Sequence, residues 1–265
     1  MEVGCCVAPE QVPALAAAGG DFAELAIVRA VMGGGDDAAG AAFAHAQAAL
    51  GAAGLPVRAY NVLLPPDLVL VGPAAGRREL DTYLRTAFGR VRQLGGRIVV
   101  CGSGRSRAIP AGVRRSAGLD QLAGTLAHLV TVAAEYDLVV ALEPLRAAES
   151  NVFNTLGESA TFLRERGLGA VRLLADLYHM MEEREPLRAL DGCADLLVHV
   201  HVADTGRRPP GQGDFPLAEF FRRLRRNGYT GDCSLECRWA DFAAEIGPSM
   251  RYTRQAARAA GWVVG

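Results

Sequence analysis

Three carboxylates and one histidine in this chain end or follow short apolar runs of the kind that form buried strands. They are Glu143, Asp176, His201 and Glu236. A charged side chain at the end of an apolar strand costs free energy unless it is paired or bound to a cation. Three carboxylate oxygens and one imidazole nitrogen suit a divalent ion such as Mn²⁺, Mg²⁺, Co²⁺ or Zn²⁺. If the four strand ends meet, the sequence predicts one metal site.

Each of these residues has an ordinary interpretation when it is taken alone. A Glu at a strand end often forms a salt bridge, an inward-facing His can be a core residue, and Asp176 could cap the turn after its strand. Four such residues at the same end of four consecutive strands are better explained by a shared cation. Without the ion, three converging carboxylates would repel one another, and at least one would take up a proton.

Side-chain alternation along the strands supports this arrangement. Successive side chains of a strand point to opposite faces, so His199 and His201 share the face opposite to the valines of residues 196–202. In the last expected strand, the same rule points Glu236 inward, like His201, and points Cys233 and Cys237 outward, towards the expected helices. His199 is expected to be a core histidine or to support the site. His45 and His128 lie on expected helices and are expected to be unrelated to it.

Eight apolar runs alternate with helical segments along the chain. The expected strands are residues 3–7, 22–28, 57–64, 97–101, 138–143, 171–174, 196–202 and 231–237. The expected helices begin near Glu10 and then cover residues 36–53, 79–94, 116–136, 155–166, 186–191, 215–227 and 240–260. This count and the length of 265 residues predict an α/β fold, a single (β/α)₈ TIM barrel domain over residues 1–265. The alternative, a doubly wound open sheet, would usually show a Gly-rich fingerprint after the first strand, which this sequence lacks.

Composition excludes several classes of partner. The net charge of −1 argues against a nucleic-acid or anionic-membrane surface, because both require a basic excess. The first residues lack the basic region of a signal peptide, and no apolar run reaches the roughly 18 residues of a membrane span. The six cysteines form no C-x-x-C pair, which indicates reduced thiols. We therefore expect a cytoplasmic enzyme that acts on a small molecule.

The order and spacing of the motifs resemble a known family, the sugar phosphate isomerase/epimerase family of xylose-isomerase-like TIM barrels. Its ketose 3-epimerase and hydroxypyruvate isomerase branch is the most similar. The resemblance runs from about Phe22 to the end of the chain. The residues that carry it are Ala141-Leu142-Glu143-Pro144-Leu145, Glu149 six positions after Glu143, Asp176-x-x-His179, His201 with Arg207 six positions later, and Glu236.

The resemblance implies roles for these residues. It implies one divalent metal ion, with Mn²⁺ expected first, on Glu143, Asp176, His201 and Glu236. Glu143 and Glu236 would also be the acid/base pair, and the substrate's oxygens would be bound by Glu149, His179 and Arg207. The substrate would be a keto-sugar, a sugar phosphate or a keto-acid. Assembly into a homodimer or a homotetramer is a separate question that the sequence does not decide. One carboxylate would remove a proton beside the metal-bound carbonyl to give an enediolate, and the return of a proton would give an epimer or an isomer.

Three other functions stay open. The first is a dehydratase of the keto-inositol or dehydroshikimate type, which shares the proton abstraction but then loses hydroxide. The second is a DNA-repair nuclease of the endonuclease IV type. That family uses three zinc ions and many histidines, whereas this chain has five histidines and no basic excess. The third is a non-catalytic sugar-binding barrel, which would be expected to lack one of the two acid/base carboxylates.

Two arginine-containing segments have separate interpretations. Residues 102–107, Gly-Ser-Gly-Arg-Ser-Arg, could bind a phosphate or carboxylate through Arg105 and Arg107, or could form an ordinary exposed loop. The arginine run between Arg222 and Arg226 is expected to be a solvated helix face.

Overall fold

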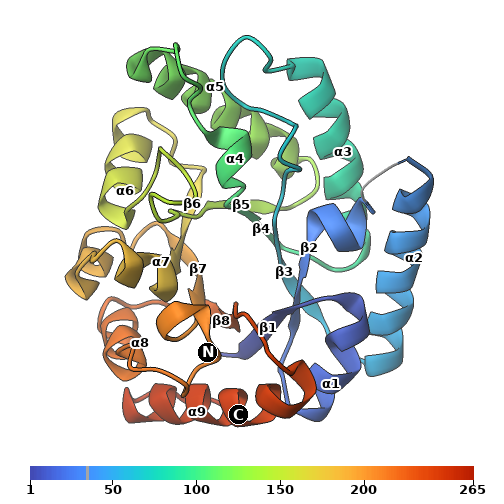
Figure 1. Cartoon of the computed structure of the whole chain (residues 1–265), viewed down its shortest axis with the longest axis vertical. Coiled ribbons are helices and arrows are strands. Elements are labelled where there is room, and N and C mark those ends of the chain that lie inside the picture. Colours follow the sequence, from blue (N-terminus) through green and yellow to red (C-terminus); the bar gives the residue numbers. More distant parts are fainter. Residues whose placement is uncertain (34–35) are drawn as a thin grey trace.

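Eight parallel strands form a closed barrel in the computed structural model, which describes residues 1–33 and 36–265 (Figure 1). Each strand pairs with the next one in the sequence, and the last pairs with the first. The strands are β1 (Val3–Val7), β2 (Ala23–Ala26), β3 (Val57–Asn61), β4 (Ile98–Cys101), β5 (Val139–Leu142), β6 (Arg172–Asp176), β7 (Leu197–Val202) and β8 (Asp232–Leu235). The predicted TIM-barrel fold is thereby confirmed.

Helices surround the barrel on its outer side (Figure 1). They are α1 (Val12–Ala17), α2 (Asp36–Ala53), α3 (Arg77–Gln93), α4 (Gly104–Arg107), α5 (Arg115–Ala134), α6 (Leu156–Glu165), α7 (Leu177–Glu182), α8 (Leu217–Arg226) and α9 (Phe242–Ala259). Shorter helical turns cover Pro9–Gln11, Ile27–Val31, Leu187–Gly192 and Thr205–Arg207. Helix α6 is capped at its N-terminus, because Oγ1 of Thr155 accepts a hydrogen bond of 3.1 Å from the amide of Glu158.

Three local features differ from the sequence-based expectation. The second strand is shorter than predicted because Ile27–Val31 forms a π-helical turn. Helices α4 and α7 were not predicted. Both follow strands of the barrel closely, so they bring Arg107 and His179 to the end of the barrel where strands finish.

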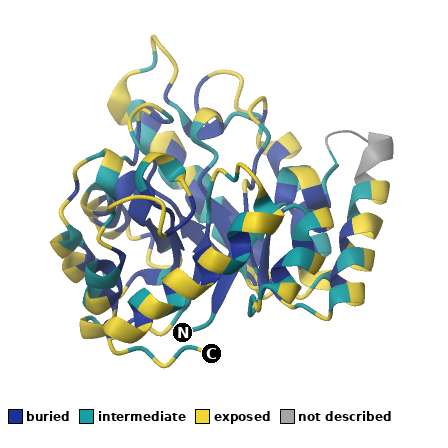
Figure 2. Ribbon diagram, turned by 60° about the horizontal axis from the view of Figure 1, so that its bottom comes forward, coloured by how far each residue is buried: buried dark blue, intermediate teal, exposed yellow. Residues whose placement is uncertain are grey.

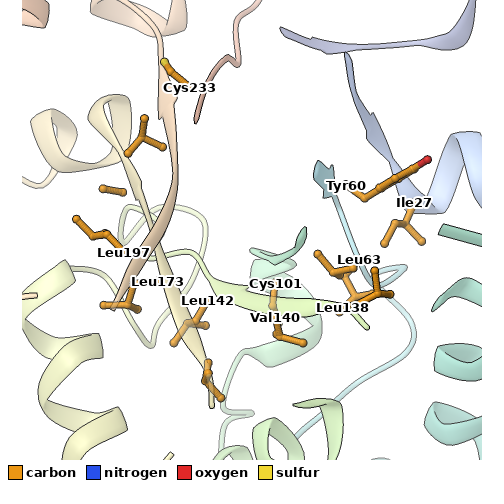
Figure 3. Close-up of a cluster of buried hydrophobic side chains, with 14 of the residues drawn as sticks. Ile27, Tyr60, Leu63, Cys101, Leu138, Val140, Leu142, Leu173, Leu197 and Cys233 are labelled. Atoms are coloured by element: carbon orange, nitrogen blue, oxygen red, sulfur yellow. The ribbon is translucent and has the colours of Figure 1, made fainter. Parts of the chain in front are cut away.

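Apolar side chains fill the space between the strands and the helices. Figure 2 shows that the strands of the barrel are buried. Figure 3 shows part of this layer, in which Leu142, Leu173 and Cys233 come from three different strands. A second, smaller cluster consists of Val100, Ala141 and Leu174. Ala141 and Leu174 lie two residues before Glu143 and Asp176, on the same faces of their strands. The apolar side chains of Ala141 and Leu174 therefore lie directly below the carboxylates of Glu143 and Asp176 in the barrel.

The arginine run on α8 is a helix face, as expected. Arg222 pairs with Glu219, and Arg223 pairs with Asp191 at 2.8 Å. Arg225 and Arg226 are exposed. In the described part of the chain, no helix combines the length and apolar composition that a bilayer crossing requires.

Candidate metal centre

The four predicted ligands lie together at the carboxyl ends of the strands. Glu143 and Glu236 follow β5 and β8, Asp176 ends β6, and His201 is the fifth residue of β7. One ligand atom from each of the four residues lies within 4.8 Å of the others. Glu143, Asp176 and His201 are 5%, 2% and 0% exposed, whereas Glu236 is partly exposed, so solvent reaches the group at Glu236.

Several polar atoms of this group lack hydrogen bonds. Among the described residues, Oε1 of Glu143, Oδ2 of Asp176 and Nδ1 of His201 are buried without a hydrogen-bond partner. Nδ1 of His201 lies 3.5 Å from Oε1 of Glu143 and 3.4 Å from Oε2 of Glu236. A buried polar atom without a partner costs about 1–3 kcal/mol, and a cation among these atoms would remove that cost. The donor set therefore fits a divalent ion.

The two proposed acid/base carboxylates differ in their affinity for a proton. Burial raises the pKa of Glu143, and the nearby charge of Glu236 adds to this effect. Burial would also raise the pKa of Glu236, but Arg207 and His201 outweigh it and hold that pKa at about 2. Two neighbouring carboxyl groups with separated pKa values are the arrangement that acid/base chemistry requires.

Two side chains fix the orientation of Glu236. Nη2 of Arg207 donates to its Oε2, and Nδ2 of Asn61 donates to its Oε1 over 3.1 Å. Arg207 has a φ of 62°, and its backbone is held by Arg238, whose amide donates to its carbonyl over 2.7 Å. Asn61 was not predicted from the sequence. The available signal was an amide side chain inside the expected strand of residues 57–64.

The three predicted substrate-binding residues lie beside the four ligands. Nη2 of Arg207 is 3.9 Å from Oδ2 of Asp176, and Nη1 of Arg207 is 3.9 Å from Oε1 of Glu149. His179 is 2% exposed, and its Nε2 lies 3.7 Å from Oδ2 of Asp176. Because the amide of Arg146 donates to Nδ1 of His179 over 3.1 Å, the ring proton is on Nε2. Their contact with a substrate stays a prediction.

Glu24 is a buried carboxylate for which the sequence suggested no role. It lies in β2 with 0% exposure and accepts hydrogen bonds from Nε2 of His199 over 2.9 Å and from Nε2 of His201 over 3.0 Å. Burial would raise the pKa of Glu24, but His201 and His199 hold it far below its usual range. His199 lies in the barrel core, as expected. A charged residue inside an apolar strand was the signal that could have identified Glu24.

The segment of residues 102–107 has neither of the two structures that were expected for it. Arg107 is only 1% exposed, and its guanidinium donates to the carbonyls of Glu143, Cys101 and Phe153 over 2.7, 3.0 and 3.3 Å. The expected anion site is therefore wrong for Arg107, since its donors bind backbone oxygens. The expected exposed loop is wrong as well, although Arg105 is exposed. Arg107 instead joins the ends of β4 and β5.

The absence of a side chain at Gly102 leaves room for the carboxylate of Glu143. A Cβ atom at this position would collide with Oε2 of Glu143. We expect Gly102→Ala to displace the carboxylate and to weaken Mn²⁺ binding by about 10–100-fold, as measured by isothermal titration calorimetry. Gly124→Ala on α5 is the matched control, because a Cβ there meets no atom within 4 Å. Equal Mn²⁺ affinity of the two variants would contradict this role of Gly102.

The cysteines are free thiols, as predicted, and all six lie in the described part of the chain. Cys233 is buried in the layer between strands and helices, as its alternation predicted. Cys6 is the cysteine found beside the site, with its Sγ 4.0 Å from Nε2 of His201. His45 and His128 lie on α2 and α5, as expected.

The chain is similar to known proteins in sequence. The family model described as xylose isomerase-like TIM barrel matches residues 12–261. The 3-dehydro-D-guloside 4-epimerase of Escherichia coli (strain K12) is 39% identical over 108 residues, which are 40% of this chain and 41% of that protein. The D-psicose 3-epimerase of Enterocloster bolteae is 34% identical over 112 residues, which are 42% of this chain and 37% of that protein. The matched segments thus span about two fifths of these curated relatives.

The chain is also similar to solved structures. One of them is the crystal structure of the apo form of 3-keto-D-glucoside 4-epimerase from Escherichia coli. Its superposition on this protein covers 96% of this chain and 99% of the epimerase chain. The TM-score is 0.81 and the sequence identity is 24%. At this identity the likeness supports the barrel fold alone.

Proposed function

The chain belongs to the xylose isomerase-like TIM barrel family, and we propose that it is a divalent-metal-dependent epimerase or isomerase of a keto-sugar. The observation that carries the proposal is the group of buried ligand atoms without hydrogen bonds on Glu143, Asp176 and His201. The matched relatives named above are a 4-epimerase and a 3-epimerase of keto-sugars, which favours epimerisation.

Glu143, Asp176, His201 and Glu236 would hold the ion, with Mn²⁺ as the expected metal. When it is bound, the ion supplies the positive charge that stabilises the enediolate formed by loss of a proton beside a carbonyl. Arg207 and the Nε2–H of His179 lie next to Asp176 and can donate hydrogen bonds to substrate oxygens. Glu149 can accept a hydrogen bond from a substrate hydroxyl.

The two glutamates would move the proton. Arg207 keeps Glu236 ionised, and Asn61 fixes its other oxygen, so Glu236 is in the protonation state in which a carboxylate can act as the base. Glu143 comes from β5, three strands away from Glu236 in the barrel order, and can return a proton from a different side. Return to the same carbon inverts it and gives an epimer. Return to the adjacent carbon gives an isomer.

Incubation of the Mn²⁺-loaded protein with ketoses, keto-glycosides and keto-acids in D₂O tests this proposal. We expect NMR to find deuterium on a carbon next to the carbonyl, in an epimerised or isomerised product. Treatment with a chelator should abolish the exchange, and added Mn²⁺ should restore it. A product that has lost water would instead support the dehydratase. Absence of exchange in every carbonyl substrate would contradict the proposal.

A further inference from the structure

The carboxylate of Glu24 forms hydrogen bonds with Nε2 of His201, the ring nitrogen that does not face Glu143 and Glu236. Both of its oxygens lie within hydrogen-bond distance of Nε2 of His201, at 3.0 and 3.1 Å. Both residues are 0% exposed, so water does not compete for this contact. The two nitrogens of an imidazole ring point in different directions. A hydrogen bond that fixes Nε2 therefore also fixes the direction of Nδ1.

That direction leads to the proposed metal site. Nδ1 of His201 is 3.4 Å from Oε2 of Glu236 and 3.5 Å from Oε1 of Glu143. Because Nε2 carries the ring proton and donates it in a hydrogen bond to a carboxylate, Nδ1 of the neutral ring carries the lone pair that can bind a cation. Carboxylates that bind the far nitrogen of a ligating histidine fix its tautomer and raise its basicity.

Glu24 is itself held in place by the strand and by a second histidine. The pairing register of β2 and β3 shifts between Ala23 and Glu24, and Glu24 pairs with Cys6 of β1. Its Oε2 also accepts from Nε2 of His199, a nitrogen that lies 3.1 Å from Oγ of Ser234. The rings of His199 and His201 meet edge to face, with centroids 5.2 Å apart. Rotation of the His201 ring would leave the buried charge of Glu24 without one of its two partners.

We infer that Glu24 is a positioning residue, which orients His201 so that Nδ1 binds the divalent cation and thereby sets the affinity for the metal. This inference rests on the proposed metal-dependent function. Cys6 and Glu24 also form a candidate ligand group with His201. The direct hydrogen bonds between Glu24 and His201 already satisfy the carboxylate and Nε2 of His201, so they account for this group without a second ion.

Metal affinity provides the first test. Mn²⁺ is titrated into the metal-free full-length protein, with Glu24→Ala, Glu24→Gln and Ser234→Ala as variants. We expect Glu24→Ala to weaken Mn²⁺ binding by about 10–100-fold. Glu24→Gln should weaken Mn²⁺ binding less than Glu24→Ala does, because its amide oxygen still accepts a hydrogen bond from Nε2 of His201. Ser234→Ala is the matched control, since Ser234 contacts His199 in the same network, and it should keep wild-type affinity.

Nitrogen NMR of the histidine side chains provides a readout that does not depend on activity. In the Zn²⁺-loaded wild-type protein, we expect His201 to carry its proton on Nε2 and the metal on Nδ1. In Glu24→Gln, the Nε2 proton should exchange faster with solvent. If Glu24→Ala does not fold, both the Mn²⁺ titration and the NMR measurement are made on Glu24→Gln.

Two results would overturn the inference. They are wild-type Mn²⁺ affinity in the folded Glu24 variants, and metal binding through Nε2 of His201. Either result leaves the proposed function intact as long as the wild-type protein binds Mn²⁺. Failure of the wild-type protein to bind any divalent ion would instead contradict the proposed function, and this inference with it.

Discussion

Glu236→Gln is expected to slow proton exchange in the keto-sugar substrate by about 10²–10⁴-fold. The amide has nearly the same shape as the carboxylate but does not accept a proton at neutral pH. The amide oxygen can still accept from Asn61, which now donates to Oε1 of Glu236. We therefore expect the variant to stay folded. Deuterium incorporation from D₂O, followed by NMR, measures the effect.

Two controls separate this effect from loss of the metal or of the fold. The Mn²⁺ content of Glu236→Gln is measured in parallel, and the exchange rate is compared at equal metal occupancy. Glu219→Gln is the matched surface variant, because Glu219 lies on α8 and pairs with Arg222 there. It should exchange at the wild-type rate. A wild-type rate in metal-loaded Glu236→Gln would exclude Glu236 as the base.

Arg107→Met is expected to reduce the free energy of unfolding by about 2–4 kcal/mol. Methionine retains much of the side-chain volume but none of the donors that bind the carbonyls of Glu143, Cys101 and Phe153. A buried carbonyl without a donor costs about 1–3 kcal/mol. The carbonyls of Cys101 and Phe153 keep a backbone donor, which limits the loss. Urea denaturation measures the difference.

Arg105→Met is the control for this prediction. Arg105 lies on the same four-residue helix but is exposed, so its replacement should change the free energy of unfolding by less than about 0.5 kcal/mol. Equal urea midpoints for the two variants would mean that the contacts of Arg107 do not stabilise the barrel. Arg107 also binds the backbone of Glu143, so Arg107→Met should weaken Mn²⁺ binding as well.

The sequence predicted the barrel because parallel strands buried on both faces appear as short apolar runs. β1 has the predicted bounds, and β7 begins one residue later than predicted. α7 could not be recognised from its six residues. Asp176 illustrates how two interpretations can both apply to one residue. Its Oδ1 accepts from the amide of Tyr178 over 2.7 Å and caps α7, while its Oδ2 belongs to the proposed metal site.

The parts of the site that the sequence did not reveal depend on contacts made when the barrel closes. Glu24 is 177 residues away from His201 in the sequence, and Asn61 is 175 residues away from Glu236. No local spacing connects such pairs. The contacts of Arg107 could not be predicted for a related reason. Arginines beside glycines suggest an anion site, but its donors bind carbonyl oxygens of later residues, Glu143 and Phe153.

The central claim is that Glu143, Asp176, His201 and Glu236 share one divalent ion. A crystal structure of the protein grown with MnCl₂, with anomalous diffraction data that locate manganese, tests it most directly. We expect one manganese ion bound by an oxygen of each carboxylate and by Nδ1 of His201. Manganese at another place in the chain, or none at this site in saturating MnCl₂, would contradict it.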